Sequence, residues 1–186
     1  GNDGSGVIYG CRELIDHVGQ YKDLKFPAQL TDAPEMVLRG GCVGIQKMEY
    51  LPGRGVYEYP YTPESFPWFY DKEQWIKYLD MLVENRMNSL YLWNGHPFAS
   101  LVKLEEYPFA VEVDEETFKK NEEMFSFLTA EADKRGIFVI QMFYNILLSK
   151  PFAEHYGLKT QDRNRPITPL ISDYTRKSVA AFIEKY

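Results

Sequence analysis

The chain has 186 residues, of which 45% are hydrophobic and 26% charged, which is enough for one domain with a substantial core. A net charge of −6 argues against a nucleic-acid or anionic-membrane surface, and no apolar run reaches membrane-spanning length. The two cysteines, Cys11 and Cys42, lack metal-site spacing, and a disulfide between them stays open.

The first 35 residues predict a short helix followed by a linker. Gly1 to Gly6 has the composition of a turn, and apolar residues then repeat on one face from Tyr9 to Val18. Gly19 is a suitable helix end. Residues 20–35 contain two prolines and little periodicity, so they are interpreted as a linker.

Three strand–helix units follow. The predicted strands are 38–45, 89–93 and 137–143. The predicted helices begin after Asp71, after Asp114, and after Ser172 or Asp173, since each of these residues can cap a helix ahead of an apolar repeat. Alternation of this kind predicts an α/β fold with a parallel sheet.

The long connections all follow strands, whereas the connections from helix to strand are only a few residues long. In α/β folds the loops after the strands gather at the carboxyl ends of the sheet, where active sites lie. Any site is therefore expected at that end.

Two short motifs resemble glycoside hydrolases. The turn Gly6-Val7-Ile8-Tyr9-Gly10 leads into a predicted helix. It resembles the turn into the last helix of a small α/β domain that precedes the barrel in β-N-acetylhexosaminidases and xylan α-glucuronidases. Leu38-Arg39-Gly40 resembles the opening of the first barrel strand in the hexosaminidases. Their His-Trp-His on the second strand is replaced by Tyr91-Leu92-Trp93, so the chain resembles the superfamily rather than that family.

The resemblance implies the first three βα units of a (β/α)8 TIM barrel, preceded by the terminal helix of a small α/β accessory domain. Residues 1–19 would be the tail of that domain, residues 20–35 a linker and residues 36–186 the partial barrel. We therefore expect a longer protein that continues after Tyr186, or another chain that completes the barrel. The main catalytic acids would lie outside this chain, and a periplasmic or secreted location is implied by the resemblance alone.

Six residues are predicted to bind substrate at the carboxyl ends of the strands. They are Arg39, Trp93, Asn94, His96, Tyr144 and Asn145. Trp93 could stack on a sugar ring, and the polar side chains could hold hydroxyl groups. In the alternative interpretation Trp93 fills the interior, Asn94 and His96 shape a turn, and Arg39 forms a structural salt bridge.

Other polar and aromatic groups are ambiguous. Gln141 either lines the site or is buried with satisfied hydrogen bonds. The loop after the first strand is rich in aromatic residues, which form either a ligand wall or a packed cluster. They are Tyr50, Tyr57, Tyr59, Tyr61, Phe66, Trp68, Phe69 and Tyr70. None of the loop glutamates 49, 58, 64, 105 and 106 follows a strand directly, so the catalytic residues are unknown.

The chain is thus predicted to be part of a glycoside hydrolase that acts on an oligo- or polysaccharide, supplying part of the substrate cleft. No cofactor or metal is predicted, and the expected partner is a carbohydrate. The first alternative is a non-catalytic carbohydrate-binding protein on the same scaffold. The second is a small self-contained α/β domain with an unrelated binding role.

Overall fold

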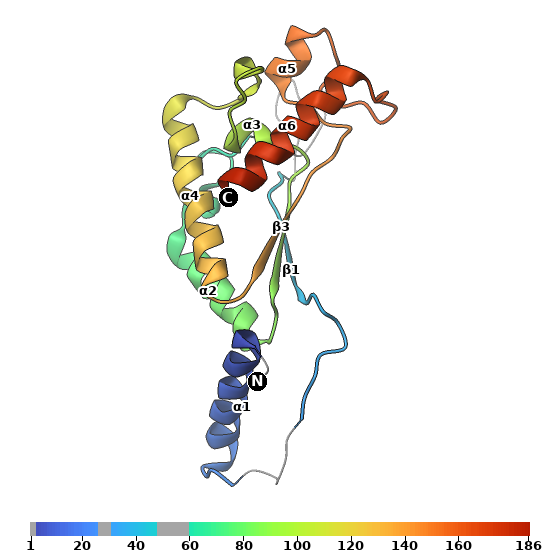
Figure 1. Cartoon of the computed structure of the whole chain (residues 1–186). Helices are drawn as coiled ribbons and strands as arrows, with labels where there is room; N and C mark the ends of the chain where they lie inside the picture. Colours follow the sequence, from blue (N-terminus) through green and yellow to red (C-terminus); the bar gives the residue numbers. More distant parts are fainter. Residues whose placement is uncertain (1–2, 26–30, 48–59) are drawn as a thin grey trace.

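The computed structural model describes residues 3–25, 31–47 and 60–186 (Figure 1). Its centre is a sheet of three parallel strands in the order β1-β2-β3. The strands are β1 (Gly40–Gly44), β2 (Ser89–Trp93) and β3 (Phe138–Met142). The presence of all three strands and their parallel pairing agree with the sequence prediction.

Two long helices cover one face of the sheet (Figure 1). They are α2 (Lys72–Glu84) and α4 (Glu115–Asp133). Both begin where predicted, because the Asp71 carboxylate accepts a hydrogen bond from the Gln74 amide at 2.9 Å and the Asp114 carboxylate accepts one from the Thr117 amide at 2.7 Å.

Four further α-helices and two 3-10 helices complete the described part of the chain. They are α1 (Gly4–Tyr21), α3 (Phe98–Leu101), α5 (Lys150–His155), α6 (Pro169–Lys185), η1 (Pro67–Tyr70) and η2 (Pro108–Ala110). In Figure 1, α1 extends beyond the end of α2, at the opposite end of the molecule from α5 and α6.

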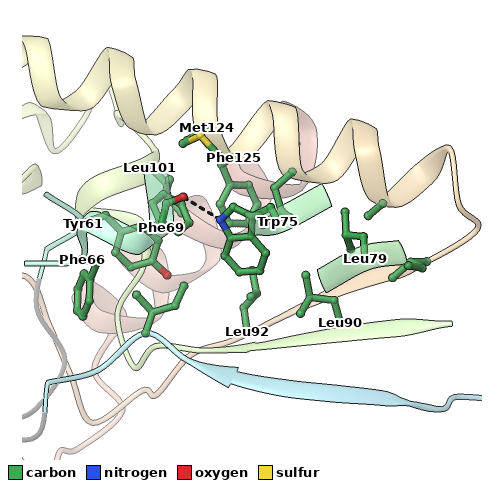
Figure 2. Packing of buried hydrophobic residues seen from close by; sticks show 14 of the residues in the cluster. Tyr61, Phe66, Phe69, Trp75, Leu79, Leu90, Leu92, Leu101, Met124 and Phe125 are labelled. Atoms are coloured by element: carbon green, nitrogen blue, oxygen red, sulfur yellow. Dashed lines mark hydrogen bonds between the residues drawn. The ribbon is translucent and has the colours of Figure 1, made fainter. Parts of the chain in front are cut away.

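The main core lies between the sheet and the two covering helices (Figure 2). Leu90 and Leu92 of β2 point into it, together with Trp75 of α2 and Phe125 of α4. The Trp75 indole donates to the Phe69 carbonyl at 2.8 Å, so its one polar group is satisfied inside the core. A second cluster, built around Phe152 and Tyr174, joins α5, α6 and the loop before α4.

The other face of the sheet is open in the described structure. Alternation along the strands directs Tyr91 and Trp93 of β2 to this face, with Phe138 and Ile140 of β3 beside them. Phe138 is 63% exposed and Trp93 is 38% exposed. Trp93 therefore stands at the carboxyl end of the open face.

The barrel assignment made from the sequence is wrong. The described residues form an open three-stranded sheet with six α-helices, not the beginning of a barrel, although the α/β class and the parallel sheet are right. The strand and helix patterns specify only the alternation of units. The closed architecture was taken from the resemblance, and nothing in the three strands themselves requires it.

Three predicted helix boundaries are also wrong. Helix α1 begins at Gly4 rather than Tyr9, because the Asp3 carboxylate caps the Gly6 amide at 2.6 Å, and it continues past Gly19 to Tyr21. Helix α6 begins at Pro169 and is capped by Thr168, not by Ser172 or Asp173. A threonine cap followed by proline is a favourable helix start that the prediction overlooked.

Cys11 and Cys42 are free and exposed, and no disulfide joins them in this structure. None of the helices in the described ranges is long and apolar enough to cross a membrane. Within the same ranges, no group of three His, Cys, Asp or Glu side chains could hold a metal ion. The proposed division at residues 19 and 35 remains a prediction.

Candidate functional site

The loops after β2 and β3 are tied together at the carboxyl end of the sheet. The Tyr144 amide donates to the Gly95 carbonyl at 2.7 Å, and the Tyr144 ring meets the Trp93 ring edge to face with centroids 6.3 Å apart. Trp93 ends β2, and Asn145 is exposed next to Tyr144. Trp93, Tyr144 and Asn145 are therefore three of the predicted site residues that the structure brings to one place.

The aromatic pair of Trp93 and Tyr144 has the chemistry of a carbohydrate platform. Flat aromatic faces pack against the C–H surfaces of sugar rings, and a rigid aromatic residue loses little conformational entropy when it binds. Trp93 lies on the open face of the sheet, and the amide of Asn145 supplies donors and an acceptor beside the pair.

Asn94 is buried and holds the strand ends together. Only 1% of its surface is exposed. Its Nδ2 donates to the Ile45 carbonyl at 3.0 Å, and its Oδ1 accepts from the His96 amide at 2.9 Å. The Ile45 amide in turn donates to the Trp93 carbonyl at 2.8 Å. These contacts match the alternative interpretation, in which Asn94 shapes the turn, rather than a direct hydrogen bond to a ligand.

His96 lies deeper than Trp93, between the site and the second core cluster. Its Nε2 is 2.9 Å from the Tyr174 hydroxyl, and its ring stacks on the Tyr174 ring and meets Phe98 edge to face. Burial, and then the nearby positive charge of Arg165, lower the pKa of His96 to about 3. The imidazole is therefore neutral at neutral pH, while part of its surface remains open to solvent.

Arg39 does not belong to this group, and the expectation that all six residues share one surface is wrong. Its side chain lies at the amino end of the sheet, where Nε donates to the Arg86 carbonyl at 3.0 Å and Nη1 to the Met36 carbonyl at 2.7 Å. The guanidinium also lies over the Tyr9 ring at 5.9 Å. Arg39 precedes β1, so its side chain is far from the carboxyl ends of the strands.

Only one end of the Gln141 side-chain amide forms hydrogen bonds within the sheet. Its Nε2 donates to the carbonyls of Leu92 and Met142 at 3.2 and 2.9 Å. Its Oε1 is buried and has no hydrogen-bond partner among the described residues. Gln141 shares the face of Leu92 and the core, so it does not line the open face.

The aromatic loop after β1 is mainly core where the structure describes it. Tyr61, Phe66 and Phe69 are fully buried, and Tyr61 and Phe69 pack with ring centroids 5.0 Å apart (Figure 2). The packed cluster is therefore confirmed for these residues. Tyr50, Tyr57 and Tyr59 lie outside the described residues, as do Glu49 and Glu58.

A separate pocket of about 270 Å³ opens beside β1 on the helix-covered face. Its lining is Val43, Trp68, Gln74, Trp75 and Tyr78. None of these is a predicted site residue. The pocket is on the opposite face of the sheet from Trp93, so we treat it as a gap in the helix packing and not as part of the site.

Carboxylates are absent directly after two of the three strands. The segments directly after β2 and β3, residues 94–97 and 143–149, contain no Asp or Glu. Glu106 is paired with Lys177 at 2.7 Å, and its carboxylate therefore supports the loop before α4. Two carboxyl groups facing one glycosidic bond are the usual requirement for hydrolysis. The described site has the character of a binding surface.

Tyr174 is the residue of this region that the sequence analysis missed. It lies in the first half of α6, inside the predicted helix, but it is not part of the apolar repeat that was used to predict that helix. The Thr168-Pro169 pair could have located the helix start. The contact between Tyr174 and His96 joins residues 78 positions apart, so no local pattern predicts it.

Comparison with known proteins agrees with the class suggested by the sequence. A solved structure described as a "GH138 enzyme targeting pectin rhamnogalacturonan II" matches 99% of this chain at 82% sequence identity, with a TM-score of 0.93. This chain is thus similar to a segment of a glycoside hydrolase, and it spans 21% of that protein's length. No family model and no curated protein matches the chain.

The predicted similarity of this chain to the glycoside hydrolases is therefore confirmed. The narrower resemblance to β-N-acetylhexosaminidases and xylan α-glucuronidases has no counterpart in the comparison and stays a prediction.

Proposed function

We propose that the chain is part of a glycoside hydrolase that acts on a pectic polysaccharide, and that it supplies part of the surface that binds the glycan. The observation that carries the proposal is the aromatic pair of Trp93 and Tyr144 at the carboxyl end of the sheet. The 82% identity to the enzyme that targets rhamnogalacturonan II supports the choice of substrate, although the match covers 21% of that enzyme.

In this proposal each residue near the strand ends has a separate task. The Trp93 ring packs against a sugar face, and Tyr144 holds it in place from the edge. The Asn145 amide and the His96 imidazole offer hydrogen bonds to sugar oxygens. Asn94 acts on the ligand only indirectly, because it fixes the turn that carries His96.

The chemistry of cleavage is assigned to residues outside this chain. This assignment rests on the segments after β2 and β3, which carry no carboxylates. The same observation favours the second candidate function, a non-catalytic carbohydrate-binding protein. Both candidates predict binding by the purified chain, and both predict that the chain alone does not cleave the glycan.

A binding experiment with two matched aromatic variants tests the proposal. Isothermal titration with oligosaccharides of rhamnogalacturonan II is expected to show binding that Trp93→Ala weakens at least roughly fivefold, because an aromatic contact contributes about 1 kcal/mol beyond its buried area. Tyr21→Ala is the control, since Tyr21 is an exposed aromatic residue on α1 at the other end of the molecule. Equal losses in both variants, or no binding by the unchanged chain, would contradict the proposal.

A measurement of cleavage separates the two candidates. Release of reducing sugar ends by a longer polypeptide that contains this chain would support the hydrolase. Binding without any release by such a polypeptide would support the carbohydrate-binding protein.

A further inference from the structure

His96 stands at the end of a column of stacked rings that reaches from the surface to the site. Near-parallel stacking joins His155 to Phe109, Phe109 to Phe152, and Phe152 to Tyr174, with centroids 4.0, 6.3 and 4.0 Å apart. Tyr174 then stacks on His96 at 5.8 Å with the ring planes 28° apart. The Tyr174 ring thus stacks on both Phe152 and His96, and its hydroxyl lies 2.9 Å from the imidazole Nε2.

The hydrogen bonds around the Tyr174 hydroxyl decide which atom carries each proton. Burial raises the pKa of Tyr174 to about 12, while hydrogen bonding with the Ser149 and Ser178 hydroxyls lowers it, so the phenol keeps its proton. Ser149 Oγ accepts from the Phe152 amide at 3.2 Å, and its own proton can be donated to the Tyr174 oxygen. The phenol proton is then available for His96 Nε2, 2.9 Å away.

A phenol that donates to Nε2 fixes the tautomer of the imidazole. A neutral histidine has one protonated and one unprotonated nitrogen, so an accepting Nε2 leaves the proton on Nδ1. Nδ1 forms no hydrogen bond with any residue in the described ranges. Nδ1 is therefore the nitrogen that can form a hydrogen bond with a ligand, and in that bond it can only be the donor.

We propose that Tyr174 is a positioning residue that holds neutral His96 in the Nδ1–H form, so that His96 donates a hydrogen bond to an oxygen atom of the bound glycan. The proposal rests on the proposed function for the ligand, but the tautomer itself can be observed without one. The site would then favour an acceptor oxygen, such as a ring oxygen, a hydroxyl oxygen or a carboxylate, at the position facing Nδ1.

Nuclear magnetic resonance of the imidazole nitrogens tests the assignment directly. In the unchanged, ¹⁵N-labelled protein at neutral pH, the correlations between ring protons and nitrogens of His96 are expected to show protonated Nδ1 and unprotonated Nε2. A protonated Nε2 would overturn the proposal, because the Tyr174 hydroxyl would then be accepting. This measurement needs no variant, so it stands even if a substitution at Tyr174 prevents folding.

Two phenylalanine variants separate positioning from packing. Tyr174→Phe keeps the ring stack and removes the hydroxyl, so His96 should lose the fixed Nδ1–H form, and glycan affinity should fall roughly tenfold. Tyr107→Phe is the matched control, because Tyr107 belongs to the same cluster but directs its hydroxyl to Asp173 at 2.8 Å. It should leave both the tautomer and the affinity unchanged. A tautomer that survives Tyr174→Phe would overturn the positioning role.

The experiment also distinguishes this inference from the proposed function. If His96 has the Nδ1–H form and Tyr174→Phe removes it, but rhamnogalacturonan II oligosaccharides do not bind the unchanged protein, the proposed function fails and the positioning role of Tyr174 stands. If the oligosaccharides bind but His96 carries its proton on Nε2, the positioning role fails and the proposed function stands.

Discussion

Replacement of Asn94 by alanine separates the two tasks that a polar residue at a strand end can have. The Asn94 side chain is almost completely buried, and it bonds to the Ile45 carbonyl and the His96 amide. The alanine side chain can form neither hydrogen bond, so the Ile45 carbonyl and the His96 amide both lose their partner. The expected consequence is lost stability, while the side chains that face the glycan stay the same.

The size of the loss follows from the two backbone groups. A buried polar group left without a partner costs about 1–3 kcal/mol. Two such groups, one of them only partly buried, give roughly 2–4 kcal/mol in the free energy of unfolding. For a domain of this size about 1 kcal/mol lowers the melting temperature by about 2–4 °C, so Asn94→Ala should lower it by about 4–16 °C.

Calorimetry and glycan titration on the same samples test this reasoning. Asn145→Ala is the control, because Asn145 is an exposed amide on the neighbouring loop and its removal should change the free energy of unfolding by less than about 0.5 kcal/mol. Below its melting temperature, Asn94→Ala should keep most of its glycan affinity, because Asn94 acts on the ligand only through the turn that carries His96. An unchanged melting temperature together with lost binding would show that Asn94 contacts the ligand, and the argument from burial would be refuted.

Two more predictions follow from His96 and from Gly41. The lowered pKa of His96, about 3 when folded against an ordinary value of 6.5, means that the unfolded chain takes up a proton first as pH falls. The neutral imidazole therefore contributes stability above pH 6.5, and this contribution is lost as the pH falls toward 3. Denaturant titrations at several pH values should show that the free energy of unfolding falls more steeply with decreasing pH in the unchanged protein than in His96→Gln. An equal dependence on pH in both proteins would contradict the prediction. A Cβ on Gly41 would lie 2.3 Å from the Tyr78 hydroxyl, so Gly41→Ala should cost about 1–3 kcal/mol. The double variant with Tyr78→Phe should recover most of this cost, because the next atom is 3.5 Å away; failure to recover would place the strain in the backbone.

The parts of the fold that the sequence predicted are those with local causes. Asp71 and Asp114 are each followed three residues later by the amide that they cap, and the apolar repeat of each helix starts directly afterwards. The strand Ser89–Trp93 was predicted with the right bounds, because a short apolar run stands between two polar segments. Such signals need no knowledge of the rest of the chain.

The errors come from information that the sequence does not hold locally. The barrel was inferred from a family likeness, and the three strands carry no pattern that requires closure. Arg39 was placed in the site because it lies within the predicted first strand and matches the family likeness there, but its carbonyl partners on Arg86 and Met36 hold it at the amino end. The pairing of His96 with Tyr174 depends on how the loop after β3 folds back, and that is a tertiary property.

The indole N–H signals of the three tryptophans give the most direct test of the account. On titration with rhamnogalacturonan II oligosaccharides, the Trp93 signal should shift, because Trp93 is the exposed indole at the carboxyl end of the sheet. The Trp75 signal should stay in place, since that indole is buried and bonded to the Phe69 carbonyl. Trp68 lies beside the pocket on the other face and should also be unaffected. A shift of Trp68 without Trp93, or no shift of any indole at saturating glycan, would contradict a carbohydrate-binding surface at the strand ends.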